Sequence, residues 1–138
     1  MQNDNQKNKE SIESIQNKLA NTYFDNVLSM KESVELKPGD VVQTLGYYNV
    51  NDGGSGLYKI RDSQESDIDD GGSIHVLKNN LVAELIVENN SVKVEQFGAK
   101  GDGISDDTVA IQKAVDYSKV VIFTKKYLLS DSIKLGSK

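Results

Sequence analysis

Aspartate is the residue type through which this sequence could most readily do chemistry, and several aspartates lie in one dense cluster. Asp102, Asp106 and Asp107 fall within six positions, where they could supply paired catalytic carboxylates or calcium ligands. Their spacing does not follow the alternating ligands of a calcium loop, and a predicted helix begins directly after them. Because a helix N-terminus favours acceptors and negative charge, we expect these residues to form a turn and cap that helix, with Ser105 or Asp106 at the cap position.

A second acidic cluster, Asp67, Asp69 and Asp70, precedes the pair Gly71-Gly72. The positions that follow lack the bidentate glutamate that a calcium loop would supply. The polar residues from Asp62 onward are typical of a loop. We therefore predict a solvated loop here rather than a metal site.

Aromatic and basic side chains offer three further candidates. Tyr47 and Tyr48 could stack on sugar rings, but neighbouring residues of a strand point to opposite faces, so we expect one to be buried and the other to lie at a subunit contact. The single histidine, His75, has no serine or carboxylate spaced for a relay, and we expect it at a surface or an interface. The pair Lys125-Lys126 is expected in a solvated turn.

Composition excludes several classes of function. The chain has 138 residues, 37% of them hydrophobic, and a formal net charge of -5, which argues against nucleic acid and anionic lipid as partners. No apolar run is long enough to cross a bilayer, so we expect no membrane partner. Without cysteine and with one histidine, neither a thiol nucleophile nor a multi-histidine metal site can be built in one copy. We predict no catalytic, cofactor-binding or metal-ligating residue and no cofactor.

The elements that position these residues begin with a predicted helix. From Ser11 to Met30 apolar residues recur every three or four positions, which places them on one helix face: Ile12, Ile15, Leu19, Tyr23, Val27 and Met30. The stripe is narrow, and isoleucine at its first two positions favours three or more strands of a coiled coil. We predict a trimeric stalk over residues 11–33 and a disordered or captured tail over 1–10. A lone helix packed on its own domain is the alternative.

Residues 34–90 are predicted to form a small antiparallel β module. Strands are expected at 41–45, 57–60, 73–77 and 81–87, where apolar residues alternate or run between turn signals. Pro38-Gly39 marks the turn before the first strand. The turns that follow contain Asn51-Asp52-Gly53-Gly54 and Asn79-Asn80, residue types that tolerate positive φ.

Residues 91–138 form the third predicted part. They begin with a short strand at Val92, pass a glycine-rich segment at 97–103 and enter a helix from about Asp107 to Tyr117, with a buried face of Ala110, Ile111, Ala114 and Val115. Three brief strands are expected after the helix, at 120–123, 127–129 and 133–135. Because open strand edges are typical of an unfinished domain, we expect this domain to continue beyond residue 138.

Two segments resemble known families. Residues 94–114, VEQFGAKGDGISDDTVAIQKA, closely resemble the opening of the pectate-lyase-like right-handed β-helix superfamily, in which this motif is structural and its helix caps the first coil. Residues 36–48, LKPGDVVQTLGYY, followed by NDGG and YKI, are similar to a module that precedes such β-helices in phage tailspikes and tail fibres. The resemblance implies an α+β homotrimer: helical stalk, small antiparallel β module, capping helix and first coil of a right-handed parallel β-helix.

The resemblance also implies a function for the whole protein. The expected role of this chain is to trimerise a phage appendage and to attach it to a tail, neck or baseplate protein of the virion. Later coils would provide receptor binding and host cell adhesion by contacting a polysaccharide of the host surface. Met1–Glu10 lacks a secretion signal, which favours this virion location over a secreted pectinase. A polysaccharide lyase or glycoside hydrolase whose catalytic coils lie outside this chain is the alternative, as is a bacterial extracellular carbohydrate-active enzyme. We expect no enzymatic activity from this chain alone, and these alternatives assign a glycan-degrading activity to the complete protein.

Overall fold

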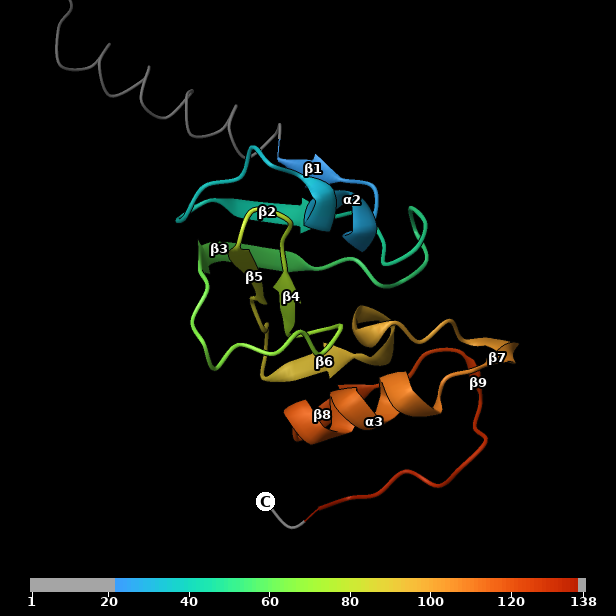
Figure 1. Cartoon of the computed structure of the whole chain (residues 1–138). Helices are drawn as coiled ribbons and strands as arrows, with labels where there is room; N and C mark the ends of the chain where they lie inside the picture. The colour runs from blue at the N-terminus through green and yellow to red at the C-terminus, as the bar shows by residue number, and fades with distance from the viewer. Residues whose placement is uncertain (1–21, 137–138) are drawn as a thin grey trace, which may run out of the picture.

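The structure is a computed structural model that describes residues 22–136, and residues 1–21 and 137–138 lie outside it. Figure 1 shows two β-rich units stacked on one another: a five-stranded sheet with a short helix above, and four short strands with a longer helix below. No helix within the described range is long and apolar enough to cross a membrane.

The upper unit confirms the predicted antiparallel β module. Its strands are β1 (Tyr23–Phe24), β2 (Val41–Thr44), β3 (Leu57–Asp62), β4 (Ile74–Val76) and β5 (Leu81–Leu85), in the spatial order β1-β2-β3-β5-β4. All neighbours pair antiparallel except β1, which runs parallel to β2. Asn51 and Asn80 adopt positive φ angles of 64° and 65° in the two turns, as their residue type predicted.

The helix predicted from Ser11 to Met30 is wrong in its last third. Tyr23 lies on strand β1, and the described helix α2 is short (Val27–Glu32), with the Asn26 side chain accepting from Ser29 N at 2.8 Å. Val27 and Met30 are buried in the module's core, so their spacing reflects packing on their own unit. The positions Ile12, Ile15 and Leu19 lie outside the described residues, and the stalk there stays a prediction.

The lower unit is the start of a parallel β-helix. It contains β6 (Ser91–Lys93), the 3-10 turn η1 (Val94–Phe97), β7 (Asp102–Asp106), α3 (Thr108–Tyr117), β8 (Val120–Ile122) and β9 (Lys126–Leu128). β6 pairs in parallel with β8, and β7 with β9. Because each strand pairs with the one reached after a full circuit of the chain, the two rungs stack as in a solenoid. The strand predicted at 133–135 is absent from the described residues.

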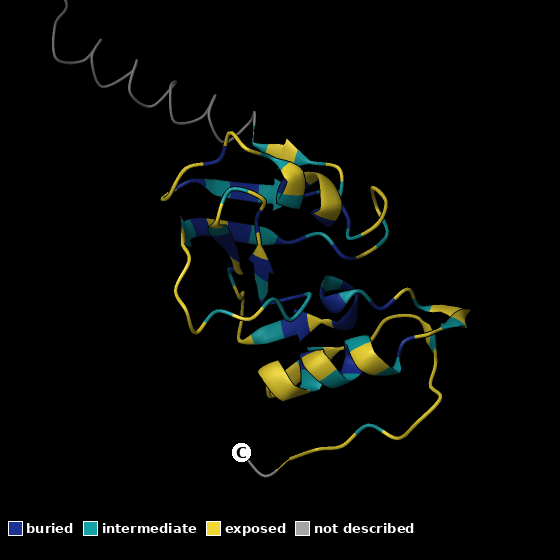
Figure 2. Cartoon of the chain, in the orientation of Figure 1, coloured by how far each residue is buried: buried dark blue, intermediate teal, exposed yellow. Residues whose placement is uncertain are grey.

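A single apolar core runs through both units. Met30, Tyr58 and Ile60 from the module are fully buried, and they belong to the same cluster as Val94 and Ile111 from the lower unit. Figure 2 shows the buried segments in the module's sheet and around β6 and η1, whereas the outer side of α3 is exposed. The module and the first coil therefore fold around shared contacts.

His75 is part of this core, contrary to the predicted surface or interface position. Its side chain on β4 is 1% exposed, its ring centroid lies 5.3 Å from that of Tyr58 and 6.3 Å from that of Tyr47, and its Nε2 has no hydrogen-bond partner among the described residues. Burial lowers its pKa to about 4, and the charged groups that face it are Asp69, Lys31 and Asp70.

Acid should destabilise the protein through this histidine. The unfolded chain takes up the proton near pH 6.5, whereas the folded state resists protonation until about pH 4. The stability present above pH 6.5 is therefore lost as the pH falls toward 4, by about 3 kcal/mol at most. Denaturant unfolding across this window should show a larger loss in the wild type than in His75→Phe, which retains a ring. The smaller loss left in the variant comes from aspartates whose pKa is lowered in the folded state, such as Asp102 and Asp106. An equal slope in both proteins would assign the acid sensitivity to other groups.

Candidate functional site

The aspartates of the first cluster each serve a separate backbone segment. Asp102 accepts from Ser105 N at 2.7 Å and Ile104 N at 2.9 Å, and Asp106 accepts from Thr108 N at 3.0 Å. Hydrogen bonds lower the pKa of both carboxyls to about 2, with Ser105 N the largest cause for Asp102 and the Ser130 hydroxyl for Asp106. A general acid needs a raised pKa, so these two groups are unsuited to that role.

The N-cap residue of α3 is Asp107 and not Ser105 or Asp106 as predicted, and its side chain makes no capping hydrogen bond to the helix. The Asp107 carboxylate, 2% exposed, instead accepts from Lys100 N at 2.8 Å and Gly101 N at 2.9 Å. It therefore fastens the glycine-rich loop to the start of the helix. Among residues 22–136 no group of three potential ligands is placed to hold a metal ion.

The second acidic cluster lies in a loop, as predicted, but its carboxylates are half-buried and bonded to protein groups instead of being solvated. Asp69 accepts from Val76 N at 2.9 Å and from the Lys31 ammonium at 2.7 Å, and Asp70 accepts from Ile74 N at 3.0 Å. Val76 and Ile74 belong to β4, an edge strand of the five-stranded sheet. Two carboxylates thus occupy edge donors that would otherwise be open to another strand.

Tyr47 and Tyr48 lie together rather than on opposite faces, because they sit in a turn and not in a strand. Their ring centroids are 4.7 Å apart. The Tyr47 hydroxyl donates to Gly71 O and the Tyr48 hydroxyl to Gly98 O, each at 2.7 Å. The pair thereby ties the β2–β3 connection to two other segments, one of them in the lower unit.

The contact between the units is concentrated on η1. The Gln96 amide accepts from Lys93 N at 3.0 Å and donates to Ser55 O of the module at 3.0 Å. Phe97 covers Gly72 so closely that a Cβ there would lie 2.1 Å from the ring. Lys125, predicted in a solvated turn, donates from its ammonium to Asp52 O of the module. Sequence reasoning missed this junction because its partners are distant along the chain.

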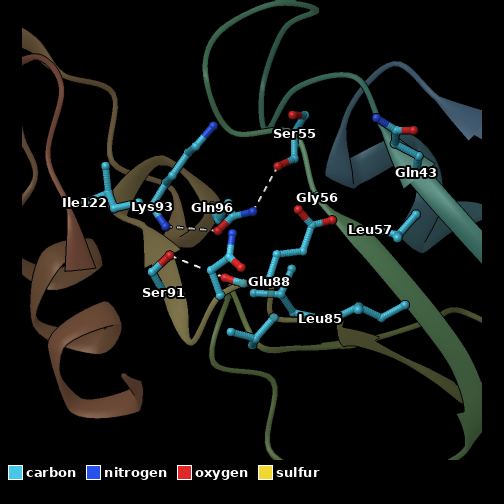
Figure 3. Close-up of a pocket in the computed structure, with 13 residues that line it drawn as sticks. Gln43, Ser55, Gly56, Leu57, Leu85, Glu88, Ser91, Lys93, Gln96 and Ile122 are labelled. Atoms are coloured by element: carbon cyan, nitrogen blue, oxygen red, sulfur yellow. Dashed lines mark hydrogen bonds between the residues drawn. The ribbon is translucent and has the colours of Figure 1, made fainter. Parts of the chain in front are cut away.

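A cavity of about 360 Å³ opens beside this junction (Figure 3). The module supplies Gln43, Leu57 and Leu85, together with the segment 86–89 that follows β5. The lower unit supplies Ser91, Lys93, Gln96 and Ile122. Sequence patterns did not single out these residues, because the cavity exists only where the two units meet.

The chemistry of the cavity suits binding better than cleavage. Glu88 is the one carboxylate among the described residues that line it, whereas glycoside hydrolysis normally uses two carboxyl groups facing each other. Amide and hydroxyl groups dominate the remaining polar surface and come from Gln43, Ser55, Asn89, Ser91 and Gln96. Such groups can donate and accept hydrogen bonds at neutral charge.

Comparison with known proteins places this arrangement in a recognisable class. The family model for rhamnogalacturonase A/epimerase, pectate lyase-like proteins matches residues 91–138. No curated protein matches the sequence. Solved structures of similar fold include a tailspike capsular polysaccharide depolymerase of an Acinetobacter baumannii bacteriophage, with a TM-score of 0.60 and 26% identity over 70% of this chain.

Two further structures share the fold at lower identity. Tailspike protein 2 of an Escherichia coli O157:H7 bacteriophage has a TM-score of 0.56 and 21% identity over 67% of this chain. WceF of Pantoea stewartii, a glycan biofilm modifying enzyme with a tailspike-like parallel β-helix, has a TM-score of 0.58 and 20% identity over 69%. The chain spans 12%, 14% and 17% of the lengths of tailspike protein 2, WceF and the depolymerase. These matches confirm the predicted resemblance to tailspikes with a pectate-lyase-like β-helix.

The role of Asp107 can be separated from that of its neighbours. Asp107→Ala should lower the free energy of unfolding by about 1–3 kcal/mol, because it leaves two backbone N–H groups without their acceptor. Asp102→Ala is the matched control: its carboxylate is exposed and serves one local turn, so its effect should be much smaller. Chemical denaturation of both variants makes the comparison, and equal losses would contradict the assignment.

Proposed function

We propose that this chain is the N-terminal part of a phage tailspike or tail fibre. In this assignment the β module and the first coil form one attachment piece, located in the virion and bound to a tail, neck or baseplate protein. The predicted stalk preceding residue 22 holds three copies together. Later coils, outside this chain, would carry the surface that contacts a host polysaccharide.

The observation that carries this proposal is the joint match of both units. The tailspike similarities cover 67% and 70% of the chain, more than the lower unit alone could supply, since the family model begins only at residue 91. A module of this kind fused to a β-helix start is therefore shared with tailspikes. The contacts through η1 would hold the module at a fixed angle to the solenoid.

Exposed apolar side chains on the lower unit support the continuation of the solenoid. Val120, Ile122 and Leu128 on β8 and β9 are 52%, 36% and 46% exposed. A further rung stacked on these strands would pair their free edges and shield part of Val120 and Leu128, whereas Ile122 also lines the cavity described above. Sequencing the coding region beyond residue 138 should reveal several hundred codons of short strand repeats among tail genes.

A glycan-degrading enzyme is the second candidate, and WceF favours it, because a bacterial glycan-modifying enzyme shares the fold. Both assignments predict that this chain alone lacks sustained activity. They differ in the genes that surround the coding region and in the location of the protein. Immunogold labelling of the phage tail would support the spike, whereas secretion from a bacterial cell would support the enzyme.

Trimerisation is the property that tests the stalk. The full chain should have three times its monomer mass by light scattering, because the narrow apolar face of Ile12, Ile15 and Leu19 favours packing between copies over packing on its own domain. Ile15→Asp should give monomers, since three carboxylates would meet near one axis. Asn17→Asp, which adds the same charge on the opposite side of the predicted helix, should remain trimeric. A monomeric wild type, or dissociation of both variants alike, would overturn the stalk.

A further inference from the structure

We propose that the cavity beside the junction binds one or two neutral sugar residues of a glycan. The inference rests on the proposed function for the biological source of the ligand, but the site itself is defined by residues of this chain. It adds a binding position at the neck of the protein, ahead of the coils to which host polysaccharide contact was assigned above.

The size and position of the cavity suit such a ligand. Its volume of about 360 Å³ is at the small end of the roughly 300–1,000 Å³ typical of small-molecule sites. Its walls come from β2, β3, the segment after β5, β6, η1 and β8. Because several elements converge on it and η1 is bonded to the module, the opposite walls are held at a fixed separation.

Unused hydrogen-bonding groups point to a polar ligand. The side chains of Gln43, Glu88 and Asn89 line the cavity and have no hydrogen-bond or ion-pair partner within residues 22–136. Gln43 is half-buried and Glu88 and Asn89 are exposed, so these groups can exchange water for a ligand. Together they offer amide donors, amide acceptors and a carboxylate acceptor. Adjacent hydroxyl groups of a sugar ring, each both donor and acceptor, match this mixture better than a purely anionic or purely cationic ligand does.

Asn89 and its neighbour Asn90 form a matched pair for testing the site, since asparagine tolerates positive φ at either position. Asn89 and Asn90 both adopt positive φ, at 55° and 57°, but only Asn89 lines the cavity. Glycine could adopt this backbone at least as easily. The need for positive φ therefore does not by itself require a side-chain amide at position 89.

Apolar and charged groups complete the lining. Leu57, Leu85 and Ile122 provide aliphatic surface for the C–H groups of a sugar ring. Glu88 and Lys93 carry opposite charges, so the described lining has no net formal charge, which favours a neutral sugar over a sulfated or uronic one. With no aromatic platform among the described lining residues, we expect weak binding, with a dissociation constant of about 1 mM.

Nuclear magnetic resonance of the full chain tests the site directly. The methyl glycosides of glucose, galactose, N-acetylglucosamine and rhamnose are titrated in turn, with glycerol as a small polyol control. At least one glycoside should cause saturable shifts in the side-chain amides of Gln43 and Asn89 and in the methyl groups of Ile122. Glycerol should cause none.

Matched variants then assign the binding. Asn89→Gly should weaken binding at least tenfold, and Asn90→Gly should leave it unchanged, with both proteins folded as judged by their amide spectra. The absence of saturable shifts with every glycoside, shifts confined to residues outside the cavity, or equal weakening in both variants would overturn the proposal. Sugar binding by a protein that proves monomeric and absent from virions would retain the site and remove the spike assignment.

Discussion

The contact of Phe97 with Gly72 is the constraint on which the arrangement of this protein depends. A side chain at position 72 would occupy the space of the ring, so the aromatic side chain of the lower unit can pack against the module only at a glycine. The neighbouring Gln96 then bonds Ser55 across the same junction. Because η1 supplies both residues, this one turn fixes how the sheet, the first coil and the cavity between them are placed.

Several acidic residues stabilise the fold by accepting hydrogen bonds from backbone N–H groups outside regular pairing. Asp107 holds the glycine-rich loop, and Asp69 and Asp70 complete the hydrogen bonding of the edge strand β4. In each case a carboxylate accepts from a backbone N–H group that has no acceptor within a helix or a sheet. Part of the chain's negative charge therefore stabilises the fold. Carboxylates that accept these hydrogen bonds are not available as acid catalysts.

Local patterns predicted much of the architecture. The strands of the module, the helix near Thr108 and the asparagine turns follow from alternation, capping and tolerance of positive φ. Local patterns failed where contacts between distant segments determine the structure. Tyr23 pairs with Gln43 in a sheet instead of extending a helix, and His75 is buried against tyrosines. The cavity could not be predicted, because its walls come from opposite sides of a junction that no short segment contains.

The shared core has a consequence for how such proteins can exchange parts by recombination. A crossover between the module and the first coil would join a module from one parent to a coil from another. Phe97 would then face a residue other than Gly72, and Gln96 would face a segment other than the one that contains Ser55. Such hybrids would lose packing on both sides at once. Viable exchange should therefore carry residues 22–136 as one block, with breakpoints outside that range.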